Sequence, residues 1–129
     1  MKKDFKKWHK EKEYIHKHNE RLFYHEREVR WCALGVNVGF ESDGKGEKSM
    51  RPVLIVKGFS REVCVCISVT TKLKNNRFYR EIHLEDGMKR AVILSQIRLI
   101  DTKRLNALVG VVRESEFKEI KQAIIHLFE

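Results

Sequence analysis

Residues 52–69, PVLIVKGFSREVCVCISV, contain two runs of β-forming residues separated by a short polar stretch. Val, Ile and Cys dominate both runs, which predicts strands over 52–59 and 62–69 with a turn at 58–61. Apolar residues follow one another almost without interruption, and this is typical of strands that are covered on both faces. We therefore expect this hairpin to lie in the core of the protein.

Further short strands are predicted on both sides of the hairpin, over 29–37, 78–84, 91–101 and 107–112. Residues 114–128 then place apolar side chains at helical spacing, at Phe117, Ile120, Ile124 and Leu127. Many short strands followed by one terminal amphipathic helix predict a mainly β protein with helices, in the form of a small barrel covered by a C-terminal helix.

Residues 1–27 differ from the rest of the chain and predict a basic N-terminal helical extension in front of a domain spanning 28–129. Lys residues alternate here with Asp and Glu, and a narrow apolar stripe runs through Phe5, Trp8, Tyr14 and Ile15. Two interpretations of this extension stay open. It is either an arm that touches nucleic acid, or a solvated helix that docks its apolar stripe on the main domain.

Composition favours a polyanionic partner. The chain of 129 residues fits one domain, and its 27 Lys and Arg outnumber 18 Asp and Glu, a formal net charge of +9. Such a balance favours nucleic acid or an anionic membrane face. No apolar run approaches the roughly 20 residues of a membrane span, and the charged N-terminus lacks the apolar region of a secretory signal. We therefore expect a cytoplasmic protein without a membrane partner.

The three cysteines, Cys32, Cys64 and Cys66, lie in apolar, strand-like surroundings. Their odd number indicates reduced core thiols rather than a disulfide framework. No second Cys/His pair stands at the spacing of metal ligands, and no phosphate-binding loop or zinc-protease motif is present. We expect neither metal nor cofactor, so attention turns to Arg, Lys and Thr acting on phosphate.

Three local features combine polar groups with strand ends. Arg51 precedes Pro52, which restrains the backbone where a polar loop enters a buried strand. A guanidinium held there can present a planar fork of donors to a phosphate. Residues 68–72, SVTTK, bring hydroxyls and an ammonium to the end of the next strand, and residues 95–101, SQIRLID, interrupt an apolar strand with polar side chains.

Taken in order, these features resemble the PemK/MazF family of toxin endoribonucleases from bacterial toxin–antitoxin systems. The family's Gly-x-Glu, Gly-containing loop and Arg-Pro are similar to residues 39–52. Its Pro/Ser-x-Thr-Ser/Thr-Lys element is similar to residues 68–72, and its Gln-x-Arg-x-Ile-Asp-x-x-Arg-Leu signature to residues 96–105. Three ordered motifs make the resemblance specific, and it extends from residue 28 to the C-terminus.

The resemblance implies an SH3-like barrel that forms a homodimer and cleaves single-stranded mRNA without metal. It implies that Arg51 and Thr70 are the catalytic pair, by their positions in the Arg-Pro and x-Thr-Ser/Thr elements. The adjacent 2′-hydroxyl is then the nucleophile, and the product is a 2′,3′-cyclic phosphate. The expected protein partner is a cognate antitoxin, which lays an acidic, partly disordered segment into the same groove.

Several further residues are candidates for binding the RNA beside this pair: Glu41, Lys45, Lys48, Thr71, Lys72, Lys74, Gln96 and Arg98. The lysines and Arg98 can equally be ordinary solvated charges, and Arg98 can be an ion-pair partner of Asp101. The general base stays open among Glu28, Glu41 and His83.

A competing class of function is a non-catalytic barrel. Such a protein binds a topoisomerase, or binds RNA or DNA without cutting it, and a degenerate domain with a binding arm is a variant of the same idea. Arg51 together with Thr70 separates the two classes, because a pure binder has no need of that pair on the groove floor.

Overall fold

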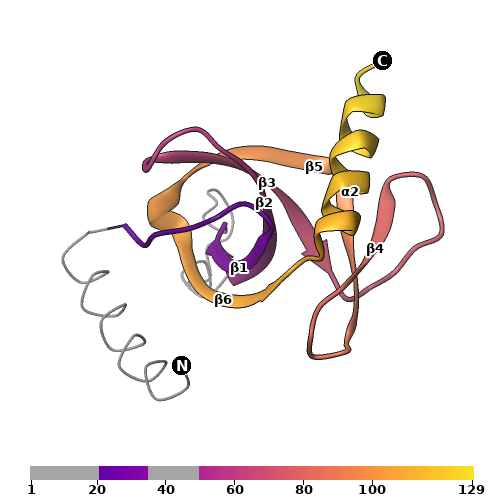
Figure 1. The fold of residues 1–129 in the computed structure, drawn as a ribbon, viewed down its shortest axis with the longest axis horizontal. Coiled ribbons are helices and arrows are strands. Elements are labelled where there is room, and N and C mark those ends of the chain that lie inside the picture. Colours follow the sequence, from indigo (N-terminus) through magenta and orange to yellow (C-terminus); the bar gives the residue numbers. More distant parts are fainter. Residues whose placement is uncertain (1–20, 35–49) are drawn as a thin grey trace, which may run out of the picture.

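The computed structural model describes residues 21–34 and 50–129 and contains six strands and a C-terminal helix (Figure 1). The elements follow one another as β1 (Glu28–Ala33), β2 (Met50–Gly58), β3 (Val63–Thr70), β4 (Tyr79–His83), β5 (Lys89–Asp101), a 3₁₀ turn (Thr102–Arg104), β6 (Leu105–Val111) and α2 (Glu114–Leu127). The strands expected from the sequence are all present. β1 ends at Ala33, and the last residues of the first expected strand, 35–37, lie outside the described part.

The strands form one antiparallel sheet in the order β4-β5-β3-β2-β1-β6, with the β2–β3 hairpin at its centre. Figure 1 shows the sheet curling into a ring, with α2 against the side where β4 and β5 lie. This confirms the predicted mainly β fold with a C-terminal helix. In the part of the chain that the structure describes, β4 and β6 are the two edges, so the hydrogen bonding leaves the small barrel open.

A long irregularity in β5 lets the sheet bend. Ile67 of β3 pairs with Ile97, whereas the next residue, Ser68, pairs with Ile93. Three residues of β5 (94–96) therefore have no paired residue on β3. Extra residues of this kind bend a strand and increase its twist. The polar Ser-Gln pair that interrupts this strand in the sequence lies in the bend.

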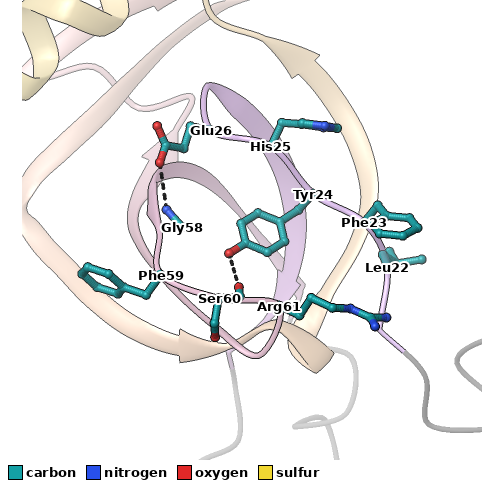
Figure 2. A pocket seen from close by; sticks show the side chains of 9 residues that line it. All are labelled: Leu22, Phe23, Tyr24, His25, Glu26, Gly58, Phe59, Ser60 and Arg61. Carbon is teal, nitrogen blue, oxygen red and sulfur yellow. Dashed lines mark hydrogen bonds between the residues drawn. The ribbon is translucent and has the colours of Figure 1, made fainter.

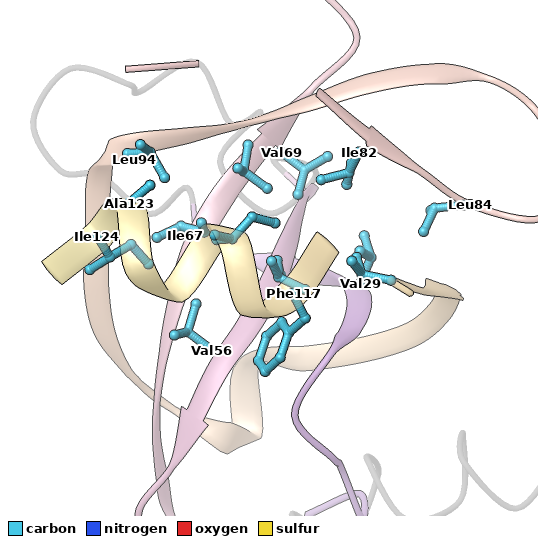
Figure 3. Close-up of a cluster of buried hydrophobic side chains, with 14 residues drawn as sticks. Val29, Val56, Ile67, Val69, Ile82, Leu84, Leu94, Phe117, Ala123 and Ile124 are labelled. Atoms are coloured by element: carbon cyan, nitrogen blue, oxygen red, sulfur yellow. The ribbon is translucent and has the colours of Figure 1, made fainter. Parts of the chain in front are cut away.

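Two apolar clusters pack on the two faces of the central strands. The cluster under α2 includes Leu54 and Val56 of β2 together with Phe117 of the helix (Figure 3). The other cluster, which we call the cysteine core, consists of Cys32, Val53, Ile55, Cys64, Cys66, Ile100 and Leu105. Alternate residues of β2 and β3 supply the two clusters, which is why their sequences are apolar without alternation.

Residues 21–27 contain no helix, although the sequence predicts a helical extension over 1–27. Their backbone pairs with the sheet instead, since Arg27 N–H donates to Ile55 O at 3.0 Å and Val112 N–H donates to Arg27 O at 2.9 Å. Leu22 is also buried, and burial of its side chain favours this packed arrangement over a free helix. The remainder of the expected helix, residues 1–20, lies outside the described residues.

The same segment packs its Tyr24 against the end of the β2–β3 hairpin, beside a cavity of about 470 Å³ (Figure 2). The Tyr24 hydroxyl donates to Ser60 O at 2.5 Å. A Cβ atom on Gly58 would lie 2.6 Å from the same hydroxyl oxygen, so only glycine fits here without movement of the ring.

Gly58→Ala should therefore lower the free energy of unfolding by about 1–3 kcal/mol, the usual cost of overpacking. Urea unfolding of the two proteins measures this loss. The double variant Gly58→Ala/Tyr24→Ala should unfold close to Tyr24→Ala alone, because the clash is gone. Equal midpoints for Gly58→Ala and the unchanged protein would show that Tyr24 does not hold the ring position described.

Candidate active site

Arg51 and Thr70 lie at the open end of the central β2–β3 hairpin, each two residues beyond the last residue pair of the two strands. Val53 of β2 pairs with Ser68 of β3, and continuing this antiparallel register by two residues places Arg51 opposite Thr70. Directly opposed residues of such a pair have Cβ atoms about 4.5–5.5 Å apart and point to the same face. That face is the one that carries the cysteine core, away from α2.

The two side chains are accessible to a ligand in this position. Arg51 is exposed, and Thr70 is half-buried. The Thr70 Oγ1 atom accepts a hydrogen bond from Lys72 N–H at 3.0 Å. A threonine hydroxyl has one donor as well as its acceptors, so this contact orients the oxygen and leaves its hydrogen available to a bound group.

Two more guanidinium groups belong to the same face. Arg98 of β5 pairs with Cys66 of β3. Arg98 and Arg104 both act on the Cys32 thiol, where their positive charges favour a lower pKa but burial outweighs them and raises that pKa to about 11. Arg104 is further held by a hydrogen bond from Nη1 to Ala33 O at 2.8 Å. Positive charge thus gathers around the cysteine core, which suits an anionic ligand.

Arg104 is a candidate that the sequence interpretation did not include among the binding residues. It stands in the Arg-Leu pair that ends the 96–105 signature, and this was the available signal. Its position near Cys32 depends on β6 returning beside β1, a long-range pairing that local sequence patterns do not reveal.

The cysteine core forms a neutral floor under these cations. All three thiols are free and buried, which confirms the prediction of reduced core cysteines. Burial raises the pKa of Cys64 to about 12 and raises that of Cys66 as well, with contributions from the neighbouring thiols. The thiols therefore stay protonated at neutral pH and do not act as nucleophiles.

This burial predicts a loss of stability in alkaline solution. The folded-state pKa of Cys32, about 11, exceeds its ordinary value of 9.0, so the contribution of the protonated thiol is complete below pH 9 and is lost as the pH rises through 11. Denaturant unfolding between pH 8 and 11 should show this decline. Cys32→Ala should show a shallower decline over the same range, and an identical slope would contradict the assignment.

The other predicted RNA-binding residues are only partly gathered at this site. Thr71, Lys72 and Lys74 are exposed and follow Thr70 directly in the β3–β4 loop. Gln96 is exposed in the bend of β5. Glu41, Lys45 and Lys48 lie in 35–49, outside the described residues.

Two candidates for the general base are engaged in other contacts. The buried carboxylate of Glu28 accepts a hydrogen bond from Arg30 Nε at 2.7 Å, four residues along β1 from the partner of Arg51. His83 on the edge strand β4 places Nδ1 2.5 Å from a carboxylate oxygen of Glu116 on α2. The third candidate, Glu41, lies outside the described residues.

The suggested ion pair between Arg98 and Asp101 is absent, and Asp101 instead pairs with Arg21 at 3.0 Å. Residues 98 and 101 stand three apart on one strand, so they point to opposite faces. The hydrogen bonds from Lys103 N–H and Arg21 lower the pKa of Asp101.

Over residues 21–34 and 50–129, no group of three or more His, Cys, Asp or Glu side chains is arranged to hold a metal ion. No helix within these residues has the length and apolar character needed to cross a membrane.

Comparison with known proteins agrees with this architecture. Structures similar to the chain include an endoribonuclease in complex with its cognate antitoxin from a mycobacterial species (17% identity, TM-score 0.63, covering 82% of this chain and 95% of that one). They also include the MazE–MazF complex of Deinococcus radiodurans (14%, 0.61, 83% and 96%) and the Mycobacterium tuberculosis toxin MazF-mt6 (16%, 0.60, 79% and 96%). At such low identity these likenesses establish a shared fold.

No curated protein sequence matches the chain significantly. The family model of the PemK-like, MazF-like toxins of type II toxin–antitoxin systems, however, matches residues 26–128, which is most of the chain and includes all six strands and the helix. The protein therefore belongs to the PemK-like, MazF-like family of type II toxin–antitoxin toxins.

Proposed function

We propose that this toxin is a metal-independent endoribonuclease that cleaves single-stranded mRNA, with Arg51 and Thr70 as its catalytic pair. The observation that carries the proposal is that the β2–β3 register leads these two residues to the same end and the same accessible face of the sheet. A guanidinium and a hydroxyl donor placed in this way can both reach the non-bridging oxygens of one phosphate. Family membership and the endoribonuclease among the similar structures support the same activity.

RNA supplies its own nucleophile in this mechanism. The 2′-hydroxyl oxygen bonds to the adjacent phosphorus and loses its proton, while the bond from phosphorus to the 5′-oxygen breaks and that oxygen gains a proton. The products are a 2′,3′-cyclic phosphate and a 5′-hydroxyl. Negative charge grows on the phosphoryl oxygens in the transition state, where Arg51 and Thr70 stabilise it. Arg51 acts as an electrostatic clamp because its pKa lies too far above neutrality for efficient proton transfer.

The surroundings of the pair fit a polyanionic strand. Lys72, Lys74, Arg98 and Arg104 place positive charge near Thr70 or around the cysteine core. An acidic segment of a cognate antitoxin would be attracted to the same charges and would exclude RNA by occupying them. The antitoxin complexes among the similar structures support this, and we extend the proposal to a homodimer acting in the cytoplasm on mRNA.

Purified protein incubated with single-stranded RNA in excess chelator tests the proposal. We expect cleavage whose new ends are a 2′,3′-cyclic phosphate and a 5′-hydroxyl. A matched oligonucleotide with 2′-deoxyribose at the cut nucleotide should remain intact, because it lacks the nucleophile. Cleavage of the deoxy substrate would contradict the mechanism, and RNA that is bound but never cut would favour the non-catalytic barrel.

A further inference from the structure

A row of residues extends the candidate active site across two more strands. Thr70 of β3 pairs with Ala91 of β5, and Ala91 pairs with Glu81 of β4. Thr70, Ala91 and Glu81 therefore stand side by side on one face of the sheet, the face that also carries Arg51. Adjacent strands are about 4.8 Å apart, so the Glu81 backbone lies about 10 Å from that of Thr70. This separation is within the reach of one nucleotide whose phosphate rests at Thr70.

A cavity of about 360 Å³ opens at this end of the row. Ala91 and Glu81 line it from the sheet, and the β3–β4 loop contributes Leu73, Lys74, Asn75 and Asn76. Tyr79, two residues before Glu81 on β4, adds an aromatic ring to the lining. An aromatic ring beside several polar groups suits an unpaired RNA base, which stacks on the ring and forms hydrogen bonds through its edge.

The Glu81 carboxylate is the one acidic group among the residues that line this cavity. Its side chain is 46% exposed, and its oxygen lies 3.8 Å from His83 Nε2, beyond hydrogen-bond distance. The same His83 ring is held through Nδ1 by Glu116 at 2.5 Å. The Glu81 oxygens can therefore accept hydrogen bonds from a ligand.

We propose that Glu81 is a specificity-determining residue that accepts two hydrogen bonds from a guanine next to the scissile phosphate. The inference rests on the proposed function, since it assigns a base to the substrate. Guanine alone among the RNA bases carries two adjacent donors, N1–H and the N2 amine, on its Watson–Crick edge, which matches the two oxygens of a carboxylate. Adenine and cytosine place a ring acceptor beside their amine, and uracil has one donor between two carbonyls, so each would repel one carboxylate oxygen.

A randomised pool of single-stranded RNA, cleaved by each protein and sequenced at the cut ends, tests this assignment. Guanine should be enriched about 5–150-fold at one position beside the cut, which corresponds to the 1–3 kcal/mol of a good bidentate pair. Glu81→Gln should lose this enrichment and gain adenine or cytosine, because an amide complements a ring acceptor beside an amine. The matched control Glu119→Gln, on an exposed position of α2 that packs on the opposite face, should keep the original preference.

The outcomes separate this inference from the proposed function. If Glu81→Gln cuts with the same base preference as the unchanged protein, the inference is wrong while the cleavage activity stands. If neither the unchanged protein nor its variants cut RNA, the proposed function fails. Binding of single-stranded RNA oligonucleotides of defined sequence then tests the cavity alone. Replacing guanine by inosine, which lacks the N2 amine, should weaken binding to the unchanged protein and not to Glu81→Gln. Equal binding of the two oligonucleotides by the unchanged protein would overturn the inference.

Discussion

Arg51→Ala is expected to lower the rate of RNA cleavage by about 10²–10³-fold, the usual effect of removing one donor that faces developing negative charge. The guanidinium is exposed beside Thr70, where it can contact a bound phosphate. Its positive charge is worth more in the transition state than in the bound substrate, because the phosphoryl oxygens gain charge as the 2′-oxygen attacks. The loss should therefore fall mainly on kcat.

Two further variants make the interpretation of this result specific. Arg51→Lys keeps the charge and loses the planar fork, so its rate should lie between those of Arg51→Ala and the unchanged protein. Thr70→Ala should also slow cleavage, since it removes the second donor. Single-turnover cleavage of a saturating oligonucleotide measures all three rates.

The fold should be unaffected by the change at Arg51. Surface substitutions usually alter the free energy of unfolding by less than about 0.5 kcal/mol, and the residue keeps its strand pairing with Cys32. Denaturant unfolding checks this point. A folded Arg51→Ala variant that cuts RNA at the unchanged rate would refute the assignment of the pair.

Glu28→Ala should reduce the free energy of unfolding by about 3–5 kcal/mol, the typical cost of removing one partner from a buried ion pair. Glu28 and Arg30 are only 8% and 4% exposed, and their charges meet at 2.7 Å. The remaining Arg30 donors reach the backbone oxygens of Asn106 at 2.9 Å and Phe23 at 3.3 Å. Without the carboxylate, the guanidinium would stay buried with no opposite charge from Glu28.

Equilibrium unfolding in urea measures this loss, with Glu85→Ala as a control for an exposed glutamate of the β4–β5 turn. The double variant Glu28→Leu/Arg30→Met should recover much of the stability, because no uncompensated charge remains. A further variant, Glu28→Gln, decides whether Glu28 is a general base. A Glu28→Gln protein of unchanged stability that has lost cleavage would give the carboxylate a chemical role, whereas we expect it to lose stability.

Much of the local structure could be predicted from the chain alone. The apolar runs over 52–59 and 62–69 became β2 and β3, because both faces of these strands are buried. One face packs under α2, and the other packs in the cysteine core. The amphipathic spacing over 114–128 became α2, because its single apolar face packs against the first of these two faces. These predictions held because strand and helix periods are local properties of the sequence.

Other features could not be predicted because they depend on distant pairing. Residues 21–27 carry a helix-like composition, yet their backbone groups bond to Ile55 and Val112 and form no helix. Asp101 forms its ion pair with Arg21 and not with Arg98. Residues 98 and 101 are three apart on β5, so their side chains point to opposite faces of the strand. Glu81 showed no signal in the sequence, since its place in the row depends on how β4 pairs with β5.

The amino-acid sequence by itself determined the strands, the helix and the family motifs that single out Arg51 and Thr70, because each depends on residues close together in the chain. Only the tertiary structure decided that these two residues lie on one face at the same end of the sheet, that Arg98 and Arg104 lie near Cys32, and that Glu81 stands in a row with Thr70 and Ala91. Strand register is the reason that local sequence could not place these residues relative to one another. It is selected by the packing of whole faces against the two cores, and a shift of one residue would turn every side chain of a strand to the other side.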